Sequence, residues 1–109
     1  MTIKAEYLQR GESLDYTNAT EDTIPDGAVV KIGGRIGVTG CPIPPGKTGS
    51  LHVTGVFEIA KSGSEAIEMG QTVYFDDTGI TGTSGDVEAG YAAAPAAAND
   101  ETVLVKPRG

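Results

Sequence analysis

The chain consists of short runs of alternating apolar and polar residues, which glycines and prolines interrupt. Alternation with a period of two is typical of β-strands that expose one face to water. The first such run, residues 3–9, places Ile3, Ala5 and Tyr7 on one side of a predicted strand. We expect this terminal strand either to close the chain's own sheet or to act as an arm that adds to the edge of a neighbouring sheet.

Two β-rich runs, residues 28–32 and 35–38, flank Gly33-Gly34 and are predicted to form a hairpin, because glycine accepts the positive φ of a two-residue turn. Residues 50–61 form the longest predicted strand, with Gly55 at its centre marking a bulge or a close backbone approach. The other predicted elements are strands at residues 72–75, 79–83, 90–94 and 102–106, a strand fragment at residues 13–16 and a single helical turn at residues 64–69.

Prolines confine two further segments to loops. Residues 40–49 contain three prolines, which cannot donate to a strand ladder. Pro95 interrupts the alanines of residues 92–98, which we interpret as a strand followed by a loop and not as a helix. Since short strands recur at intervals of roughly 8 to 12 residues, the predicted fold is all-β, a single small β-barrel or β-sandwich with short hairpins and little or no helix.

One pattern occurs twice along the chain. Residues 24–32 and 67–75 share the form I-x-x-G-x-x-V-x-apolar at an offset of 43 residues. Each copy is interpreted as a turn that feeds a strand. Because a repeat architecture needs at least three copies, this pair indicates two similar hairpins within one β-structure.

The composition agrees with a small domain that has a thin core. We expect residues 1–109 to form one domain, because domains usually contain roughly 100 to 200 residues. Hydrophobic residues make up 39% of the chain, but with only four Tyr, two Phe and no Trp, small side chains must fill most of the core. Sixteen glycines and six prolines exclude a bundle of long helices.

Charge and the shortness of the apolar runs restrict the partners. The net charge of −7 repels phosphate, and nucleic-acid binding needs clustered Lys and Arg, so no nucleic-acid partner is expected. Cys41 is the single cysteine, which excludes an intrachain disulfide. No run approaches the roughly 20 apolar residues of a membrane helix or resembles a signal peptide, so we expect a soluble protein, made in the cytoplasm, without a membrane partner.

Gly46-Lys47-Thr48 resembles the end of a phosphate-binding loop, but the rest of that motif is missing. Its first glycine would stand at Cys41. Such a loop points successive backbone N–H groups at phosphate, and Pro42, Pro44 and Pro45 have no N–H group. We therefore expect no nucleotide, no cofactor and no small-molecule substrate.

The side chains needed for metal binding or hydrolysis are also scarce. Zinc sites use three or four protein ligands, and the chain has one histidine, His52, and one cysteine. The acidic pairs Asp76-Asp77 and Glu21-Asp22 lack the alternating oxygen spacing of a calcium loop. A nucleophilic serine would need His52 as its base, and no G-x-S-x-G motif occurs. We expect no metal site and no catalytic residues, with His52 on a half-exposed strand.

Asp77-Thr78-Gly79 matches the D-[ST]-G motif of aspartic proteases, whose retroviral members are β-rich homodimers of similar size. Their chemistry needs two carboxylates, one from each subunit, that share a proton. An apolar residue normally precedes the motif and a small one follows it, whereas this chain has Asp76 and Ile80. Asp and Gly also suit a turn between two strands, which is the interpretation we favour. A small homodimeric aspartic protease using Asp77 is the alternative function.

The order and spacing of the β-rich segments resemble a known family, the small capsid cement (head decoration) proteins of tailed bacteriophages and prophages. Each segment alone is unspecific, being Gly, Val and Thr in strand patterns; their order and the total length carry the resemblance. The segments are residues 11–17, 27–30, 49–51, 53–61, 70–76, 90–92 and 102–105.

The resemblance implies a compact β-fold without enzymatic activity that binds the outer surface of the major capsid protein shell and stabilises the head. Such proteins are commonly trimers at three-fold positions, which implies a homotrimer on the virion surface after synthesis in the bacterial host. Some members carry a recombinase label, which the missing ATP-binding loop does not support. We expect residues 1–10 to be a capsid-binding strand or arm that uses Ile3, Ala5 and Tyr7.

Overall fold

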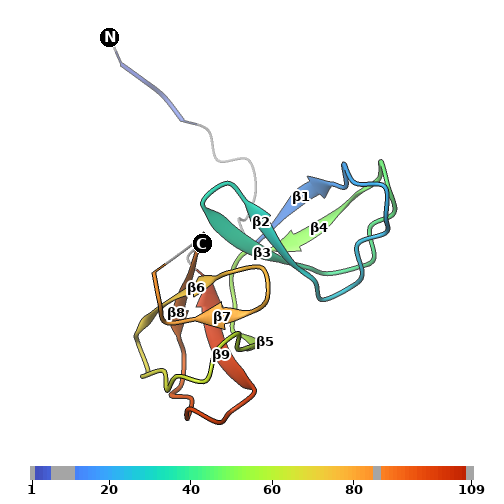
Figure 1. Cartoon of the computed structure of the whole chain (residues 1–109). Coiled ribbons are helices and arrows are strands. Elements are labelled where there is room, and N and C mark those ends of the chain that lie inside the picture. Colours follow the sequence, from blue (N-terminus) through green and yellow to red (C-terminus); the bar gives the residue numbers. More distant parts are fainter. Residues whose placement is uncertain (1, 6–11, 85–86, 108–109) are drawn as a thin grey trace.

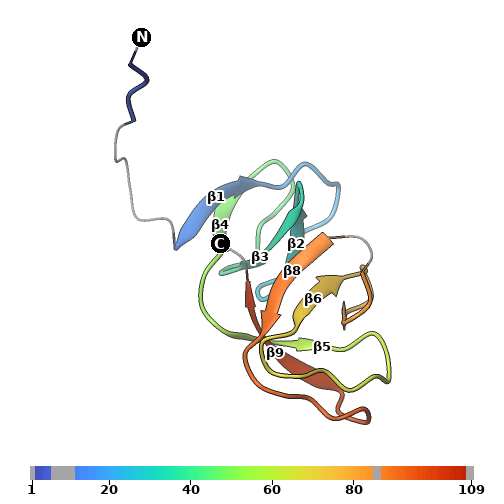
Figure 2. The same ribbon diagram turned by 90° about the vertical axis from the view of Figure 1, so that its left-hand side faces the viewer.

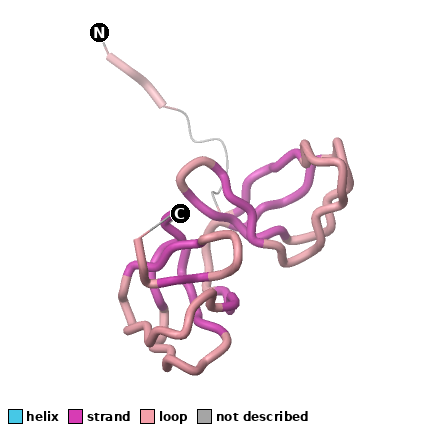
Figure 3. Tube along the Cα trace, in the orientation of Figure 1, coloured by secondary structure: helices cyan, strands magenta, loops and turns pink. Residues whose placement is uncertain are grey.

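Two antiparallel sheets make up the protein, as the computed structural model shows for residues 2–5, 12–84 and 87–107 (Figures 1 and 3). No helix occurs in these ranges. The predicted all-β class is confirmed. Of the two architectures that the sequence allowed, the structure has the sandwich-like one, because its sheets do not close into a barrel. The first sheet, in the order β1-β4-β3-β2, contains β1 (Ser13–Thr17), β2 (Val29–Ile32), β3 (Arg35–Thr39) and β4 (Thr48–His52). The second, in the order β5-β9-β8-β6-β7, contains β5 (Phe57–Ala60), β6 (Thr72–Phe75), β7 (Ile80–Thr81), β8 (Val87–Ala92) and β9 (Thr102–Pro107).

The predicted hairpin and several of the predicted strands are confirmed. β2 and β3 form the expected hairpin, with Ile32 opposite Arg35 and Gly33 at φ 63° in the turn. Strands also occur where residues 72–75 and 102–106 were predicted to form them. The alanine-rich segment is a strand to Ala92 followed by a loop.

The predicted long strand over residues 50–61 is wrong, because the chain passes there from one sheet to the other. β4 ends at His52 and β5 begins at Phe57. Gly55 lies between them at φ 115°, a conformation that disfavours other residues, and it turns the chain away from the first sheet. The apolar alternation therefore marked burial correctly but ran across two different sheets.

Two shorter predictions are corrected as well. Residues 64–69 form no helical turn, because Ile67 instead pairs with Ala96 through two backbone hydrogen bonds of 2.8 and 2.9 Å. The supposed fragment at residues 13–16 is the full strand β1, which pairs with β4 over its whole length. In both cases a distant partner in the chain determines the structure.

Each sheet is built by one half of the chain, and the two halves have the same plan. Strands β1, β2, β3 and β4 correspond in order and pairing to β5, β6, β8 and β9. Leu14 lies opposite Leu51 in the first half as Phe57 lies opposite Val105 in the second. Each half also has an isolated β-bridge at the equivalent place. Ile24 pairs with Ile43 in the first half, and Ile67 pairs with Ala96 in the second.

The repeated sequence pattern marks the turn before β2 and the turn before β6. Gly27 donates its N–H to the carbonyl of Thr39 at 2.9 Å, and Gly70 donates its N–H to the carbonyl of Ala92 at 2.8 Å. Both glycines have positive φ, 76° and 85°. The two similar hairpins of the sequence interpretation are thus parts of a larger internal duplication.

A buried asparagine holds the loop between β1 and β2. Asn18 is fully buried, and its side-chain amide donates to the carbonyls of Asp22 and Ile43 at 2.7 Å. Its side-chain oxygen accepts hydrogen bonds from the N–H and hydroxyl groups of Thr20. All of its polar groups are therefore used, which offsets the cost of burying them.

The halves are joined through β3, which lies against β8 and β9 (Figure 2). Ile36 on β3 is 2% exposed and is part of the core of the second half. The other members of that core are small or β-branched: Ile59, Ile67, Val73, Ile80, Ala89, Ala92, Ala96, Val103 and Val105.

We predict that Ile36→Ala lowers the free energy of unfolding by roughly 2 to 5 kcal/mol, because it leaves a cavity where the two halves meet. Val56→Ala is the control, since Val56 is 55% exposed and its truncation should cost less than about 0.5 kcal/mol. Urea unfolding followed by circular dichroism measures both. Equal, small effects of the two substitutions would show that Ile36 does not join the halves.

Candidate interaction surfaces

The N-terminal segment lies outside the two sheets. Residues 2–5 form no strand and lie apart from the sheets in both views (Figures 1 and 2). Ile3 is 91% exposed and Ala5 is exposed, whereas Tyr7 lies outside the described residues. The strand predicted from residue 3 onward is therefore absent over residues 3–5, which have no neighbouring strand to pair with. Of the three residues of the predicted arm, Ile3 and Ala5 therefore lie on an exposed segment.

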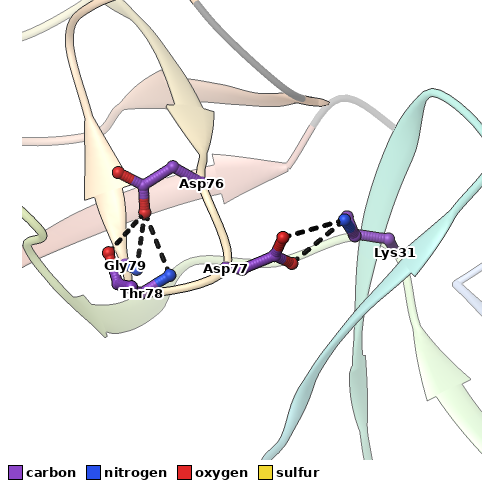
Figure 4. Close-up of polar contacts among 5 residues, drawn as sticks. All are labelled: Lys31, Asp76, Asp77, Thr78 and Gly79. Atoms are coloured by element: carbon purple, nitrogen blue, oxygen red, sulfur yellow. Dashed lines mark hydrogen bonds and ion pairs between the residues drawn. The ribbon is translucent and has the colours of Figure 1, made fainter.

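The Asp-Thr-Gly motif lies in the turn between β6 and β7, as the sequence predicted (Figure 4). The carboxylate of Asp76 accepts hydrogen bonds from the N–H and hydroxyl of Thr78, at 3.0 and 2.8 Å, and from the N–H of Gly79 at 3.0 Å. Hydrogen bonds from the hydroxyls of Ser62 and Thr78, followed by those from the two N–H groups, lower the pKa of Asp76 to about 2. Asp76 therefore holds the turn through its hydrogen bonds. The sequence predicted the turn itself but not that Asp76 holds it.

Asp77 forms an ion pair with a lysine of the first sheet. Its Oδ1 lies 3.0 Å from Nζ of Lys31 on β2, and the two side chains are 58% and 40% exposed (Figure 4). Asp77 also has φ 74°, as expected at a turn. The positive φ and the exposed ion pair of Asp77 agree with the turn interpretation of the motif.

The proline-rich loop uses its own amides within the fold. Gly46 donates its N–H to the carbonyl of Asn18 at 2.8 Å, and Lys47 donates its N–H to the carbonyl of Pro44 at 3.0 Å. These two N–H groups are thus already bonded within the fold. The loop is a connection between β3 and β4.

A family model for phage cement proteins matches residues 8–107. The chain belongs to the phage cement protein family. No match was found among curated proteins or among solved structures. The family is one of structural proteins of the phage capsid, and its match covers both duplicated halves of this cement protein.

Two hollows lie on the surface of the cement protein. The first, about 460 Å³, lies between the halves, with Val29 and Val38 on one side and Phe57, Phe75 and Asp77 on the other. The second, about 420 Å³, is lined by residues of β6, β8 and β9, among them Tyr91, whose ring lies 5.8 Å from Nζ of Lys106.

Most large apolar side chains on the surface of the cement protein are scattered. Single exposed apolar residues are normal in proteins and do not by themselves mark a contact. In the described ranges these are Ile3, Leu14, Val56, Met69, Tyr91 and Leu104. Over the same ranges, the structure has no group of three or more potential metal-binding side chains and no helix that is long and apolar enough to cross a membrane.

The acid stability of the protein should depend on Asp76. Its pKa is lower in the folded protein than the ordinary value of 3.8, so its ionised form stabilises the fold above that pH. We predict that the difference in unfolding free energy between wild type and Asp76→Asn shrinks as the pH falls from about 4 to about 2. Urea unfolding across this range measures it.

Asp77→Asn is the control, because it makes the same chemical change at the neighbouring position of the same turn. Asn also tolerates positive φ, and the exposed ion pair with Lys31 is worth at most about 1 kcal/mol, so a small effect is expected at neutral pH. A difference for Asp76→Asn that stays constant or grows as the pH falls would contradict the role given to Asp76.

Proposed function

We propose that this cement protein binds the outer surface of the major capsid protein shell and stabilises the head by bridging neighbouring capsid subunits. The family match over residues 8–107 is the observation that carries the proposal. A protein that binds only the assembled shell stabilises it by mass action, without any catalytic step. The net charge of −7 suits a protein that must stay soluble at high copy number.

The proposal assigns the first contact with the shell to the N-terminal segment. Ile3 and Ala5 lie on one side of the alternating sequence and are exposed, as an arm that waits for a partner would be. An extended segment binds a sheet edge through its backbone, and its alternate side chains give specificity. Tyr7 follows the same alternation and is the largest of the three proposed contact residues.

The proposal includes a homotrimer at three-fold positions of the shell, on the virion surface, after synthesis in the host cytoplasm. A thin core of Ala, Val and Ile gains from surface buried between subunits, which supports oligomerisation on the shell. The proposal includes no enzymatic step, and the ion pair between Asp77 and Lys31 supports a structural role for the motif that suggested a protease.

We predict that deleting residues 1–9 leaves the fold intact and abolishes binding to expanded heads that lack cement protein. The two sheets begin at Ser13, so the deletion removes none of their strands. Tyr7→Ala should weaken binding by roughly 1 to 3 kcal/mol if its ring is an anchor in the interface. Co-sedimentation of the proteins with heads measures both effects.

Circular dichroism provides the folding control for the deletion. Binding of the truncated protein at the wild-type level would rule out the arm but leave the capsid role standing. An unfolded truncated protein would show that the segment belongs to the protein's own sheet. Failure of the wild type itself to bind heads would overturn the proposed function.

A further inference from the structure

The first half packs against the second half through one side of its sheet. Val29 lies opposite Val38, and Ile36 is two residues from Val38 on the same strand, so these three side chains share that side. Ile36 belongs to the core of the second half, and Val29 packs against this core. We call Val29, Ile36 and Val38 the joining face of the first half.

The second half meets this joining face with Phe57, Ile59 and Val73. Ile59 and Val73 belong to the core that contains Ile36, and Phe57 packs against this core. Phe57 and Ile59 also line the hollow of about 460 Å³ between the halves. We call Phe57, Ile59 and Val73 the receiving face of the second half.

The internal duplication gives each half a counterpart of both faces. Thr72 lies opposite Tyr91 as Val29 lies opposite Val38, so Thr72 and Tyr91 form the joining face of the second half. The same strand registers define the receiving face of the first half. The counterparts of Phe57, Ile59 and Val73 are Leu14, Tyr16 and Val30.

The joining face of the second half is open to solvent. Tyr91 is 43% exposed, whereas its counterpart Val38, which faces the second half, is 8% exposed. Tyr91 and Thr72 line the second hollow, of about 420 Å³, together with Gly70. The counterparts of these three residues form the first-half wall of the hollow between the halves, Gly27, Val29 and Val38. The second hollow is therefore one wall of the same contact, without its partner in the described part of the chain.

The receiving face of the first half is only partly covered. Leu14 is 40% exposed, and Tyr16 and Val30 are half-buried. The counterparts of Tyr16 and Val30 in the second half, Ile59 and Val73, are 9% and 0% exposed. A surface that the second half buries is thus accessible in the first half.

The accessible part of this receiving face lies on the outer strands of the first sheet. Ile43 and Leu51, which belong to the same half, are each 1% exposed. The exposure is therefore confined to β1 and β2, which form the two edges of this sheet. In the second half, Ile36 from a joining face contributes to the corresponding core. In the described part of the chain, no further joining face is available to do the same for the first half.

We propose that the joining face of the second half packs against the receiving face of the first half of another copy of this chain. A second copy is the partner because it carries the matching face, and the contact between the halves shows how two such faces fit. The contact within the chain is thereby continued from copy to copy. A contact between two different faces can close into a ring, and a ring of three copies agrees with the homotrimer of the proposed function, on which the proposal rests for the presence of neighbouring copies.

The contact between copies is weaker than the contact within one chain, because its joining face is more polar. By strand register, Tyr91 and Glu88 take the positions of Val38 and Ile36. Interfaces between proteins that also exist apart are about as polar as the rest of the surface, and they are enriched in Tyr. Copies held side by side on a shell meet at a high effective concentration, which favours such a contact.

Cross-linking between two different variants tests which faces meet. Cys41→Ser removes the native thiol, and Leu14→Cys or Tyr91→Cys then places one thiol on the receiving or the joining face. The counterparts of these two positions, Phe57 and Val38, line the same hollow between the halves. At about 1 mM protein with a short bis-maleimide, we expect the mixture of the two variants to form linked dimers roughly tenfold faster than either variant by itself.

Val56→Cys in the same Cys41→Ser background is the matched control. Val56 is 55% exposed and lies between β4 and β5, outside both faces. Mixtures of this variant with Leu14→Cys or Tyr91→Cys should react only at the background rate. Mixed dimers of Leu14→Cys and Tyr91→Cys at that background rate, or equally fast linking of each variant by itself, would overturn the proposal.

Nuclear magnetic resonance of the protein without added cysteines provides a second readout. We expect the methyl signals of Leu14 and Val30 to shift as the protein concentration rises to about 1 mM. Tyr91→Asp should abolish these shifts although it lies in the other half, whereas Val56→Asp should retain them. Shifts that persist in Tyr91→Asp, or their absence in the wild type, would contradict the contact.

Neither experiment uses heads, so its failure differs from failure of the proposed function. Normal head binding without cross-linking between the two faces would overturn the contact between copies alone. Cross-linking between the two faces by a protein that does not bind heads would support the contact and refute the proposed function.

Discussion

The burial of Ile36 is the contact on which the arrangement of the molecule depends. It lies on β3 of the first sheet but belongs to the core of the second half, so it links two structures that the sequence encodes one after the other. The rest of that core consists of Ala, Val and Ile, which individually bury little surface. A small domain with such side chains has few contacts to spare, and each half gains from the presence of the other.

Duplication followed by a single local difference explains how one plan yields two unlike surfaces. β7 covers the second half, and its turn, held by Asp76, also reaches the first half through the ion pair between Asp77 and Lys31. The first half has only Gly33-Gly34 at the corresponding place.

Local chemistry was readable from the sequence, and contacts between distant segments were not. The hairpin at Gly33-Gly34 and the Asp76 turn depend on residues close in the chain, so their patterns were sufficient. The break after His52 was missed because alternation continues through Gly55 from one sheet into the other. The sequence pattern revealed only the part of the duplication before β2 and β6. The longer connection at residues 76–86 changes the offset between the two halves for all later strands. Leu14 is 40% exposed although it pairs with the buried Leu51, and no local pattern in the sequence indicates this difference.

If this cement protein stabilises the phage head as proposed, it raises the temperature at which the head melts. Differential scanning calorimetry measures this temperature for expanded heads without cement protein, recorded alone and with saturating protein. We expect a higher melting temperature for the heads in the presence of the protein, reaching a plateau when every binding position is filled. Heads that sediment without the protein and melt at an unchanged temperature would contradict it.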